Sequence, residues 1–299
     1  MDLLGTLKSR IGFGTATSVG GLAMADEDVS PLEAGLYLIG MGPGRMELMT
    51  SRALRTARRC DDRLYEAYTA LWPEHELQRL EKHIGPIERV MRPAIEQPEE
   101  LLQRAKTASI GVLVVGDPLQ ATTHVDLQLR CLEQGVACHI EHGLSITTLA
   151  SGTSGLSNYK FGRQTTLTYP HGSWIATSPL EVIMLNKTNG FHTLVLLDLD
   201  PTGQGVGQQQ PMTPSDAHNA LQLMKQKLLE ANNDEVLDAF DTWTAIVCSD
   251  LGCEDEAMYT TTIGQLSSVE GGRLNTILIP GSMSDIEKSA ISRWNVEVK

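Results

Sequence analysis

The regular alternation of short apolar segments with amphipathic segments between residues 35 and 143 constrains the fold most strongly. Each apolar segment has the length of a buried strand, and the segments between them carry apolar residues at helical spacing. Strands that are separated by crossover helices form a parallel sheet with both faces covered. The sequence therefore predicts an N-terminal α/β domain over residues 35–143, with strands at 36–40 (LYLIG), 62–68 (DRLYEAY), 88–91 (ERVM), 110–115 (IGVLVV) and 136–143 (VACHIEHG).

The pattern changes after residue 143. A Gly- and Ser-rich stretch, SGTSGLSNYKFGRQ (151–164), leads into short strands that are mixed with longer connections. This mixture predicts a second α/β domain with a mixed sheet over residues 144–299. The polar insert PTGQGVGQQQP (201–211) predicts a mobile loop.

The first 34 residues resemble no folded segment. Lys8 and Arg10 precede a stretch that ends in Ala23–Ala25, a faint imitation of a signal peptide, but Gly, Thr and Ser dilute its apolar part. We expect residues 1–34 to be a flexible extension, or an over-long start with Met24 as the initiator. No later segment approaches the roughly 18 apolar residues of a membrane span.

Composition and charge exclude some classes of partner. The formal net charge is −13, which disfavours nucleic acid and anionic membranes and suits a cationic small ligand or a merely soluble surface. The five cysteines are odd in number and include no Cys-x-x-Cys pair, so neither a zinc site nor a disulfide framework is indicated. We expect core thiols in a reducing, cytoplasmic setting.

A glycine-rich loop, GMGPG (40–44), follows the first predicted strand. It departs from the dinucleotide fingerprint G-x-G-x-x-G, because Arg45 stands where the third glycine belongs and Pro43 lacks a backbone N–H. The loop is then either a tight structural turn or a segment whose backbone comes close to a ligand that has no phosphate. Ligands of parallel α/β sheets bind beyond the carboxyl ends of the strands, which favours the second interpretation.

Polar residues also follow the fourth predicted strand, in GDPLQATTH (116–124). Asp117-Pro118 alone is ordinary turn chemistry, and either threonine can cap the next helix. The argument for a site is cumulative, since the carboxyl ends of neighbouring strands converge. No His-x-x-x-His spacing, nucleophile elbow or P-loop lysine is present, so we expect neither a metal nor a covalent nucleophile.

Five segments occur in the order typical of one family: LYLIGMGPG, LYEAYTALW, GDPLQATTH, LSNYKFGRQTTLTYP and HTLVLLDLD. From about residue 35 to the C-terminus the chain resembles the diphthine synthases, which belong to the tetrapyrrole-methylase-like class of methyltransferases. The resemblance implies two α/β domains with S-adenosylmethionine in the cleft between them, S-adenosylhomocysteine as a product, and a homodimer. It also implies repeated methylation of the amino group of aminocarboxypropyl-histidine in translation elongation factor 2, which yields diphthine in diphthamide biosynthesis.

The resemblance also implies particular cofactor contacts. Asn275 stands where the family has a histidine, and because an amide donates and accepts hydrogen bonds we expect this variation to be tolerated. The positions that match the family's cofactor contacts are Pro43, Asp117, Gln120, Ser145, Ile146, Leu197, Leu251 and Asn275.

Methyl transfer from a sulfonium is an in-line displacement, so the protein mainly positions the reactants and excludes water. Our hypothesis for the substrate-facing wall is Tyr68, Thr122, Thr123 and His124. Lys160 and Arg163 are candidates for holding the substrate carboxylate.

Other functions remain open at this point. The chain could be a methyltransferase of the same fold that acts on a tetrapyrrole or on RNA. Methylation of RNA would require a basic rim around the site. Methylation of a tetrapyrrole would leave the segments YEAYT and ATTH unexplained. The chain could also be a degenerate protein that binds S-adenosylmethionine without turnover, for which Asn275 is the one hint.

Overall fold

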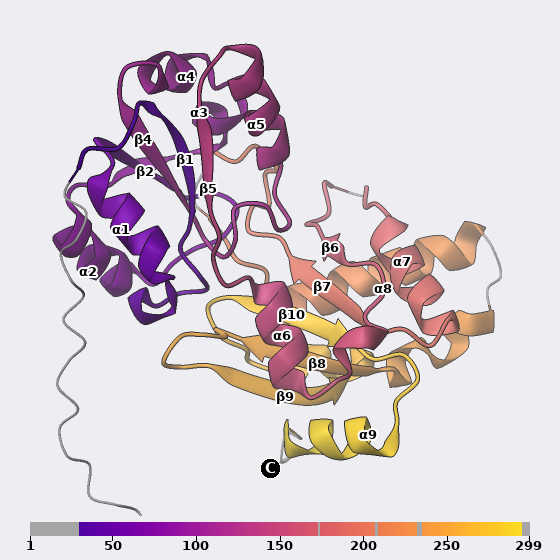
Figure 1. The fold of residues 1–299 in the computed structure, drawn as a ribbon. Helices are drawn as coiled ribbons and strands as arrows, with labels where there is room; N and C mark the ends of the chain where they lie inside the picture. The colour runs from indigo at the N-terminus through magenta and orange to yellow at the C-terminus, as the bar shows by residue number, and fades with distance from the viewer. Residues whose placement is uncertain (1–29, 173, 207–208, 232–234, 295–299) are drawn as a thin grey trace, which may run out of the picture. The chain divides into compact units, whose positions relative to one another are not determined.

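A computed structural model describes residues 30–172, 174–206, 209–231 and 235–294 (Figure 1). Residues 31–299 form one compact unit. Most of the predicted flexible extension, 1–34, lies outside the described residues. Within its described end, Leu32 packs against the core and the Glu33 carbonyl accepts a 3.0 Å hydrogen bond from the Tyr37 hydroxyl.

The first sheet is parallel throughout, as the sequence predicts. Its strand order is β3-β2-β4-β1-β5. All residues of the two strands β1 and β4 are buried, which agrees with a parallel sheet that is covered on both faces. The strands are β1 (Gly35–Gly40), β2 (Asp62–Glu66), β3 (Glu88–Val90), β4 (Ser109–Val114) and β5 (Cys138–Glu141).

Helices cover this sheet on both faces (Figure 1). Along β1, Tyr37 and Ile39 belong to the core under α1 and α2, whereas Leu36 and Leu38 belong to the core under α4 and α5. This division follows from the two-residue period of a strand. The elements are η1 (Met46–Leu48), α1 (Ser51–Arg59), α2 (Glu74–Ile84), α3 (Arg92–Glu96), α4 (Glu99–Ala105) and α5 (His124–Glu133).

The second sheet is mixed, again as predicted, with the order β6-β7-β10-β8-β9. The pair β6–β7 is parallel and the other three pairs are antiparallel. The strands are β6 (Thr165–Leu167), β7 (Thr193–Leu197), β8 (Thr244–Ser249), β9 (Ala257–Thr262) and β10 (Asn275–Ile279). The division of the chain into domains at residues 143–144 stays a prediction.

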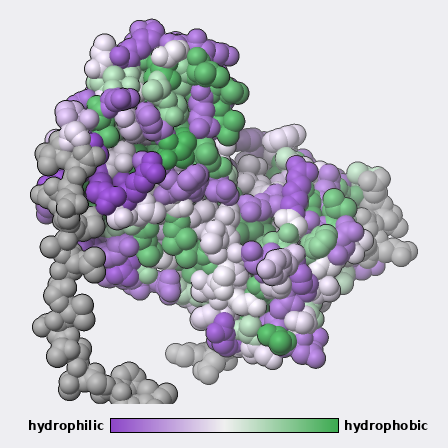
Figure 2. Space-filling view, in the orientation of Figure 1, coloured by the Kyte–Doolittle hydropathy of each residue, from purple (hydrophilic) through white to green (hydrophobic). Residues whose placement is uncertain are grey.

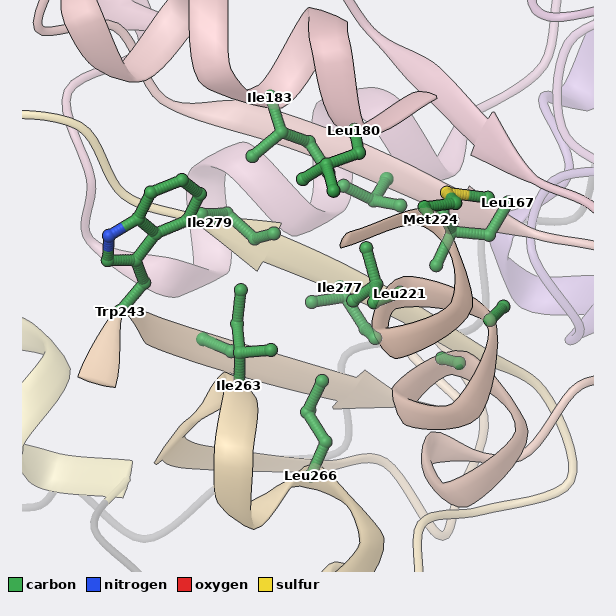
Figure 3. Packing of buried hydrophobic residues seen from close by; sticks show 14 of the residues in the cluster. Leu167, Leu180, Ile183, Leu221, Met224, Trp243, Ile263, Leu266, Ile277 and Ile279 are labelled. Atoms are coloured by element: carbon green, nitrogen blue, oxygen red, sulfur yellow. The ribbon is translucent and has the colours of Figure 1, made fainter. Parts of the chain in front are cut away.

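Both faces of the second sheet are also covered. Side chains of α7 and α8 pack with β10 and the 3-10 turns in the larger core (Figure 3). Helices α6 and α9 contribute Ala150 and Ile291 to the core on the other face. The elements are α6 (Ile146–Ser154), η2 (Asn158–Lys160), α7 (Ser178–Thr188), α8 (Pro214–Ala231), η3 (Glu235–Thr242), η4 (Ile263–Ser268), α9 (Asp285–Ile291) and η5 (Ser292–Trp294).

None of the helices in the described part of the chain combines the length and the apolar character that a membrane crossing requires.

Candidate functional site

Three strand ends of the first sheet meet in backbone contact. Gly40 ends β1, Gly116 follows β4 and Gly143 follows β5. A Cβ atom on Gly143 would lie 2.1 Å from the Gly116 carbonyl oxygen, and one on Gly40 would lie 2.5 Å from the Gly143 nitrogen. Only glycine allows these segments to approach so closely.

The glycine-rich loop after β1 is tied into this contact. The Gly42 N–H donates to the Gly116 carbonyl at 3.1 Å, and the Gly116 N–H donates to the Gly42 carbonyl at 2.9 Å. The Trp72 indole also donates to the Gly42 carbonyl, at 3.0 Å. The amides that a phosphate would need are therefore occupied, in agreement with the missing dinucleotide fingerprint.

A cavity of about 500 Å³ opens beside these strand ends, and it is lined by residues that follow strands of the first sheet and by residues of the second sheet. This volume is typical of a small-molecule site. The structure brings all the predicted cofactor positions to its wall: Pro43, Asp117, Gln120, Ser145, Ile146, Leu197, Leu251 and Asn275.

The backbone of the wall is strained at two places. Among the described residues, Ala121 (φ 57°) and Asp250 (φ 46°) are the non-glycine residues with positive φ, and both line the cavity. The Asp250 carboxylate accepts hydrogen bonds from the Arg273 N–H (2.7 Å) and the Leu274 N–H (3.0 Å), which hold this turn. Such strain is concentrated at functional sites, so it supports assigning a ligand to the cavity.

The lining of the cavity is predominantly acidic. Its carboxylates are those of Glu96, Asp117, Asp198 and Asp250, and its one cation among the described residues is Arg92. This balance favours a cationic ligand, for example one that carries a sulfonium.

Asp117 holds the loop after β4 in place. Its Oδ2 lies 2.8 Å from His142 Nδ1 and accepts a 3.2 Å hydrogen bond from the Gly143 N–H. Its Oδ1 accepts a 2.9 Å hydrogen bond from the Leu119 N–H. The carboxylate thus joins the segments that follow β4 and β5, which explains how the cavity wall keeps its shape.

Asn275 organises the opposite wall. Its Oδ1 accepts hydrogen bonds from the Ser249 hydroxyl (2.7 Å) and the Gly272 N–H (2.9 Å), and its Nδ2 donates to the Gly272 carbonyl at 3.0 Å. An amide side chain has a second Nδ2 hydrogen, which it can offer to a ligand.

The candidates for the substrate-facing wall divide into two groups. Tyr68, Thr122 and Thr123 line the cavity, whereas His124 lies behind it, with 1% of its surface exposed. His124 Nε2 lies 2.7 Å from Glu66 Oε2, and Nδ1 lies 2.9 Å from the Pro118 carbonyl. His124 therefore joins the segments after β2 and β4 from behind and is a positioning residue.

The charge of His124 follows from its partners. The Pro118 carbonyl and the Glu66 carboxylate lie next to the two ring nitrogens, and an acceptor beside each nitrogen favours the protonated ring. Burial alone would lower the pKa of His124, but the Glu66 carboxylate and the Pro118 carbonyl more than offset it, so the pKa is raised.

The His124–Glu66 pair predicts a specific pH dependence of stability. Since the folded pKa is raised, the pair stabilises the fold fully below the ordinary pKa of 6.5, and the gain is lost as the pH rises through the folded pKa. Urea unfolding at about pH 6 and about pH 9 should therefore show a smaller gap between the wild type and His124→Gln at the higher pH. In a Glu66→Gln background the gap should no longer change in this way. A gap that widens with pH would contradict the assignment.

Tyr68 stays protonated at neutral pH. Burial raises the pKa of its hydroxyl, and the carboxylates of Glu66 and Glu96 add to this effect. The hydroxyl can therefore donate a hydrogen bond into the cavity, but as a neutral phenol it is a poor base for a substrate amine.

The structure does not bring Lys160 and Arg163 to the cavity wall. Lys160 Nζ donates to Glu287 Oε2 at 2.9 Å and to the Ser282 carbonyl, and the Arg163 side chain is exposed. Lys160 thus pairs with the buried Glu287 carboxylate, and this pair holds α9 to the segment before β6.

Arg92 is a charged lining residue that the sequence patterns did not single out. It lies two residues beyond Val90, where β3 ends, much as Asp117 lies three residues beyond Val114, where β4 ends. Applying the strand-end rule to ERVM as well as to IGVLVV would have drawn attention to it.

The fold is that of a known class. The family model for tetrapyrrole (corrin/porphyrin) methylases matches residues 35–267. The chain is thus a methyltransferase of this class, an S-adenosylmethionine-dependent enzyme.

Individual relatives identify the family within this class of methyltransferases. The diphthine synthase of Methanoregula boonei is 32% identical over 262 residues, which cover 87% of this chain and 98% of the relative. The diphthine methyl ester synthase of Yarrowia lipolytica is 33% identical over 265 residues, which cover 84% and 86%. The chain belongs to the diphthine synthase family.

Solved structures agree with this assignment. A crystal structure of diphthine synthase superimposes with a TM-score of 0.72 at 25% identity, covering 87% of this chain and 95% of the other. A conserved hypothetical protein of Aeropyrum pernix K1 superimposes with a TM-score of 0.76 at 28% identity, covering 87% and 89%.

Proposed function

We propose that this protein uses S-adenosylmethionine to methylate, repeatedly, the amino group of aminocarboxypropyl-histidine in translation elongation factor 2, yielding diphthine for diphthamide biosynthesis. The observation that carries the proposal is the convergence of the eight cofactor positions on one cavity, although they come from widely separated parts of the chain. Family membership supports the same reaction.

The cavity fits the cofactor in size and in charge. Its volume of about 500 Å³ suits a nucleoside-sized ligand, and Ile146, Leu197 and Leu251 offer apolar surface. The acidic lining favours a cation. When bound, S-adenosylmethionine supplies an electrophilic methyl group on a sulfonium. The residues of the chain hold the reactants in line and exclude water, which is most of what such a displacement needs.

The substrate amine has to lose a proton before each attack. Because Tyr68 is itself held protonated, the proton goes to solvent or to a lining carboxylate. Neither route requires a metal or a covalent intermediate.

A homodimer and a cytoplasmic location are further parts of the proposal. Val125, Leu129 and Leu132 lie three and four residues apart on α5, and each is more than half exposed. Figure 2 shows hydrophobic surface in the region where Figure 1 draws α4 and α5. An exposed apolar face of this kind is typical of a contact surface and supports self-association.

Replacing Ile146 by tryptophan tests the cofactor site. Ile146 begins α6, lies half-buried at the edge of the core and lines the cavity, so the larger ring should extend into the cavity. We expect the affinity for S-adenosylmethionine, measured by calorimetry, to fall about 10- to 100-fold while the melting temperature is unchanged.

Thr148→Trp is the matched control, because Thr148 is exposed on the same helix and does not line the cavity. Equal affinities for the wild type and Ile146→Trp would place the cofactor elsewhere and contradict the proposed site.

A further inference from the structure

We propose that Arg92 binds the carboxylate of the aminocarboxypropyl group and so positions the amine that is methylated. This inference rests on the proposed function and adds a substrate-recognising residue to it. It assigns to Arg92 the role for which the sequence suggested Lys160 and Arg163.

Arg92 has the right place and charge. Among the described residues that line the cavity it is the one with a cationic side chain. It is the first residue of α3, and its backbone N–H donates to the Gly205 carbonyl at 3.2 Å.

The guanidinium of Arg92 is positioned by the Tyr68 ring, but one of its N–H groups has no hydrogen-bond acceptor. It lies 5.4 Å from the centre of the Tyr68 ring, in a cation–π contact. Its Nε is buried and has no hydrogen-bond partner, since the nearest carboxylate oxygen, Glu96 Oε1, is 3.9 Å away. A buried donor without an acceptor costs free energy, and an anionic ligand in the cavity would remove that cost.

The strand order separates Arg92 from the cofactor positions that follow strands of the first sheet. Asp117 follows β4, Pro43 follows β1 and Ser145 follows β5, so these lie at one side of the order β3-β2-β4-β1-β5. Tyr68 and Arg92 follow β2 and β3, at the other side. This division favours the substrate over the methionine end of the cofactor as the source of the carboxylate.

The insert 201–211, for which the sequence predicts a mobile loop, contributes to the position of Arg92. Asp200 Oδ1 accepts from the Thr202 N–H (2.8 Å) and Oδ2 accepts from the Gly205 N–H (2.5 Å), which forms a compact turn. A Cβ atom on Gly205 would lie 2.6 Å from Arg92 Nε. The turn therefore fixes the position of the Arg92 side chain, and only glycine leaves room for it.

In this substrate, a contact to the carboxylate also orients the amine. The amine and the carboxylate of an aminocarboxypropyl group are attached to the same carbon atom. A guanidinium that grips the carboxylate with two parallel hydrogen bonds therefore restricts where the amine can lie. This restriction provides the orientation that an in-line displacement requires.

The test compares Arg92→Gln with the wild type in two measurements: steady-state methyl transfer to elongation factor 2 that carries aminocarboxypropyl-histidine, and calorimetry with S-adenosylmethionine. We expect kcat/KM for the protein substrate to fall about 10- to 100-fold, with an unchanged Kd for S-adenosylmethionine. Arg92→Lys keeps the charge but loses the planar fork, and should recover only part of the activity. Gly205→Ala, which retains the guanidinium but displaces it, should reproduce the selective loss.

Arg89→Gln is the matched control, because Arg89 lies on β3, pairs with Glu74 at the surface and does not line the cavity. An Arg92→Gln protein with the kcat/KM of the wild type would overturn the inference. A parallel loss of S-adenosylmethionine affinity would also overturn it, and would assign the contact to the cofactor carboxylate. A wild type that binds S-adenosylmethionine and adds no methyl would instead contradict the proposed function itself.

Discussion

Replacing Gly143 by alanine should abolish S-adenosylmethionine binding and destabilise the fold by about 3 kcal/mol. The added Cβ would lie 2.1 Å from the Gly116 carbonyl oxygen and 2.9 Å from Gly40 Cα. Both obstacles are backbone atoms of neighbouring strand ends, so no side-chain rotation can make room. The strand ends would have to separate, and the loop that Asp117 holds at the cavity wall would move with them. Urea unfolding and calorimetry measure the two effects.

Gly152→Ala is the control for this variant. Gly152 lies within α6, and a Cβ atom there would have no neighbour within 4 Å. Alanine in a helix interior should be neutral or stabilising by roughly 0.5–1 kcal/mol. The account of the site would be wrong if Gly143→Ala unfolded at the same urea concentration as the wild type and still bound the cofactor.

The second large effect is expected for Glu287→Ala, which should lower the free energy of unfolding by about 3–5 kcal/mol. The buried Glu287 carboxylate accepts hydrogen bonds from Lys160 Nζ (2.9 Å), His192 Nε2 (2.8 Å) and the Ser157 N–H (3.0 Å). Removing it leaves these donors, one of them a half-buried ammonium, without their acceptor. Asp285→Ala on the same helix should leave the unfolding midpoint unchanged, because the Asp285 side chain is fully exposed. Similar midpoints for the two variants would contradict the role of Glu287.

The same cluster predicts loss of stability in acid. Burial alone would raise the pKa of Glu287, but hydrogen bonds from Lys160, Ser284, Ser157 and His192 hold it well below the ordinary 4.5. A lowered folded pKa means that the unfolded chain binds the proton more readily, so the contribution of Glu287 is complete above pH 4.5 and is lost as the pH falls further. The difference in unfolding free energy between the wild type and Glu287→Ala should therefore shrink below pH 4.5.

His192 adds to this acid sensitivity. Its Nδ1 accepts a 3.1 Å hydrogen bond from the Gly281 N–H, so the ring is the neutral tautomer that donates from Nε2. Burial lowers the pKa of His192, and protonating it in acid would cost this hydrogen bond.

Much of the fold could be predicted because hydrophobic periodicity reports on burial. Strands β1 and β4 are buried apolar runs that the sequence shows directly, and the rule that ligands bind beyond strand ends points to the loops after these two strands. The cofactor positions came from the resemblance, and the structure places them on one cavity wall.

Other elements depend on tertiary contacts that sequence patterns do not report. Helix α6 forms in a stretch rich in Ser and Gly because Ser145 caps it and Ala150 packs on the second sheet. Strand β9, AMYTTT, lies at the sheet edge and is too polar to be recognised by an apolar run.

The side chains that would contact the carboxylate were the hardest to predict. Helix α3 spans only five residues, so Arg92 carried no helical period that would mark its position. Lys160 drew attention through its neighbours in sequence, yet its partner Glu287 is 127 residues away along the chain.

The central claim is methyl transfer to the modified histidine, and intact mass spectrometry tests it most directly. Elongation factor 2 that carries aminocarboxypropyl-histidine is incubated with this protein and S-adenosylmethionine, and with the Ile146→Trp variant as a control. We predict that the wild type increases the mass of elongation factor 2 by more than one methyl unit. With the Ile146→Trp variant the same increase should be much slower. An unchanged mass from a wild type that binds S-adenosylmethionine in calorimetry would contradict the account.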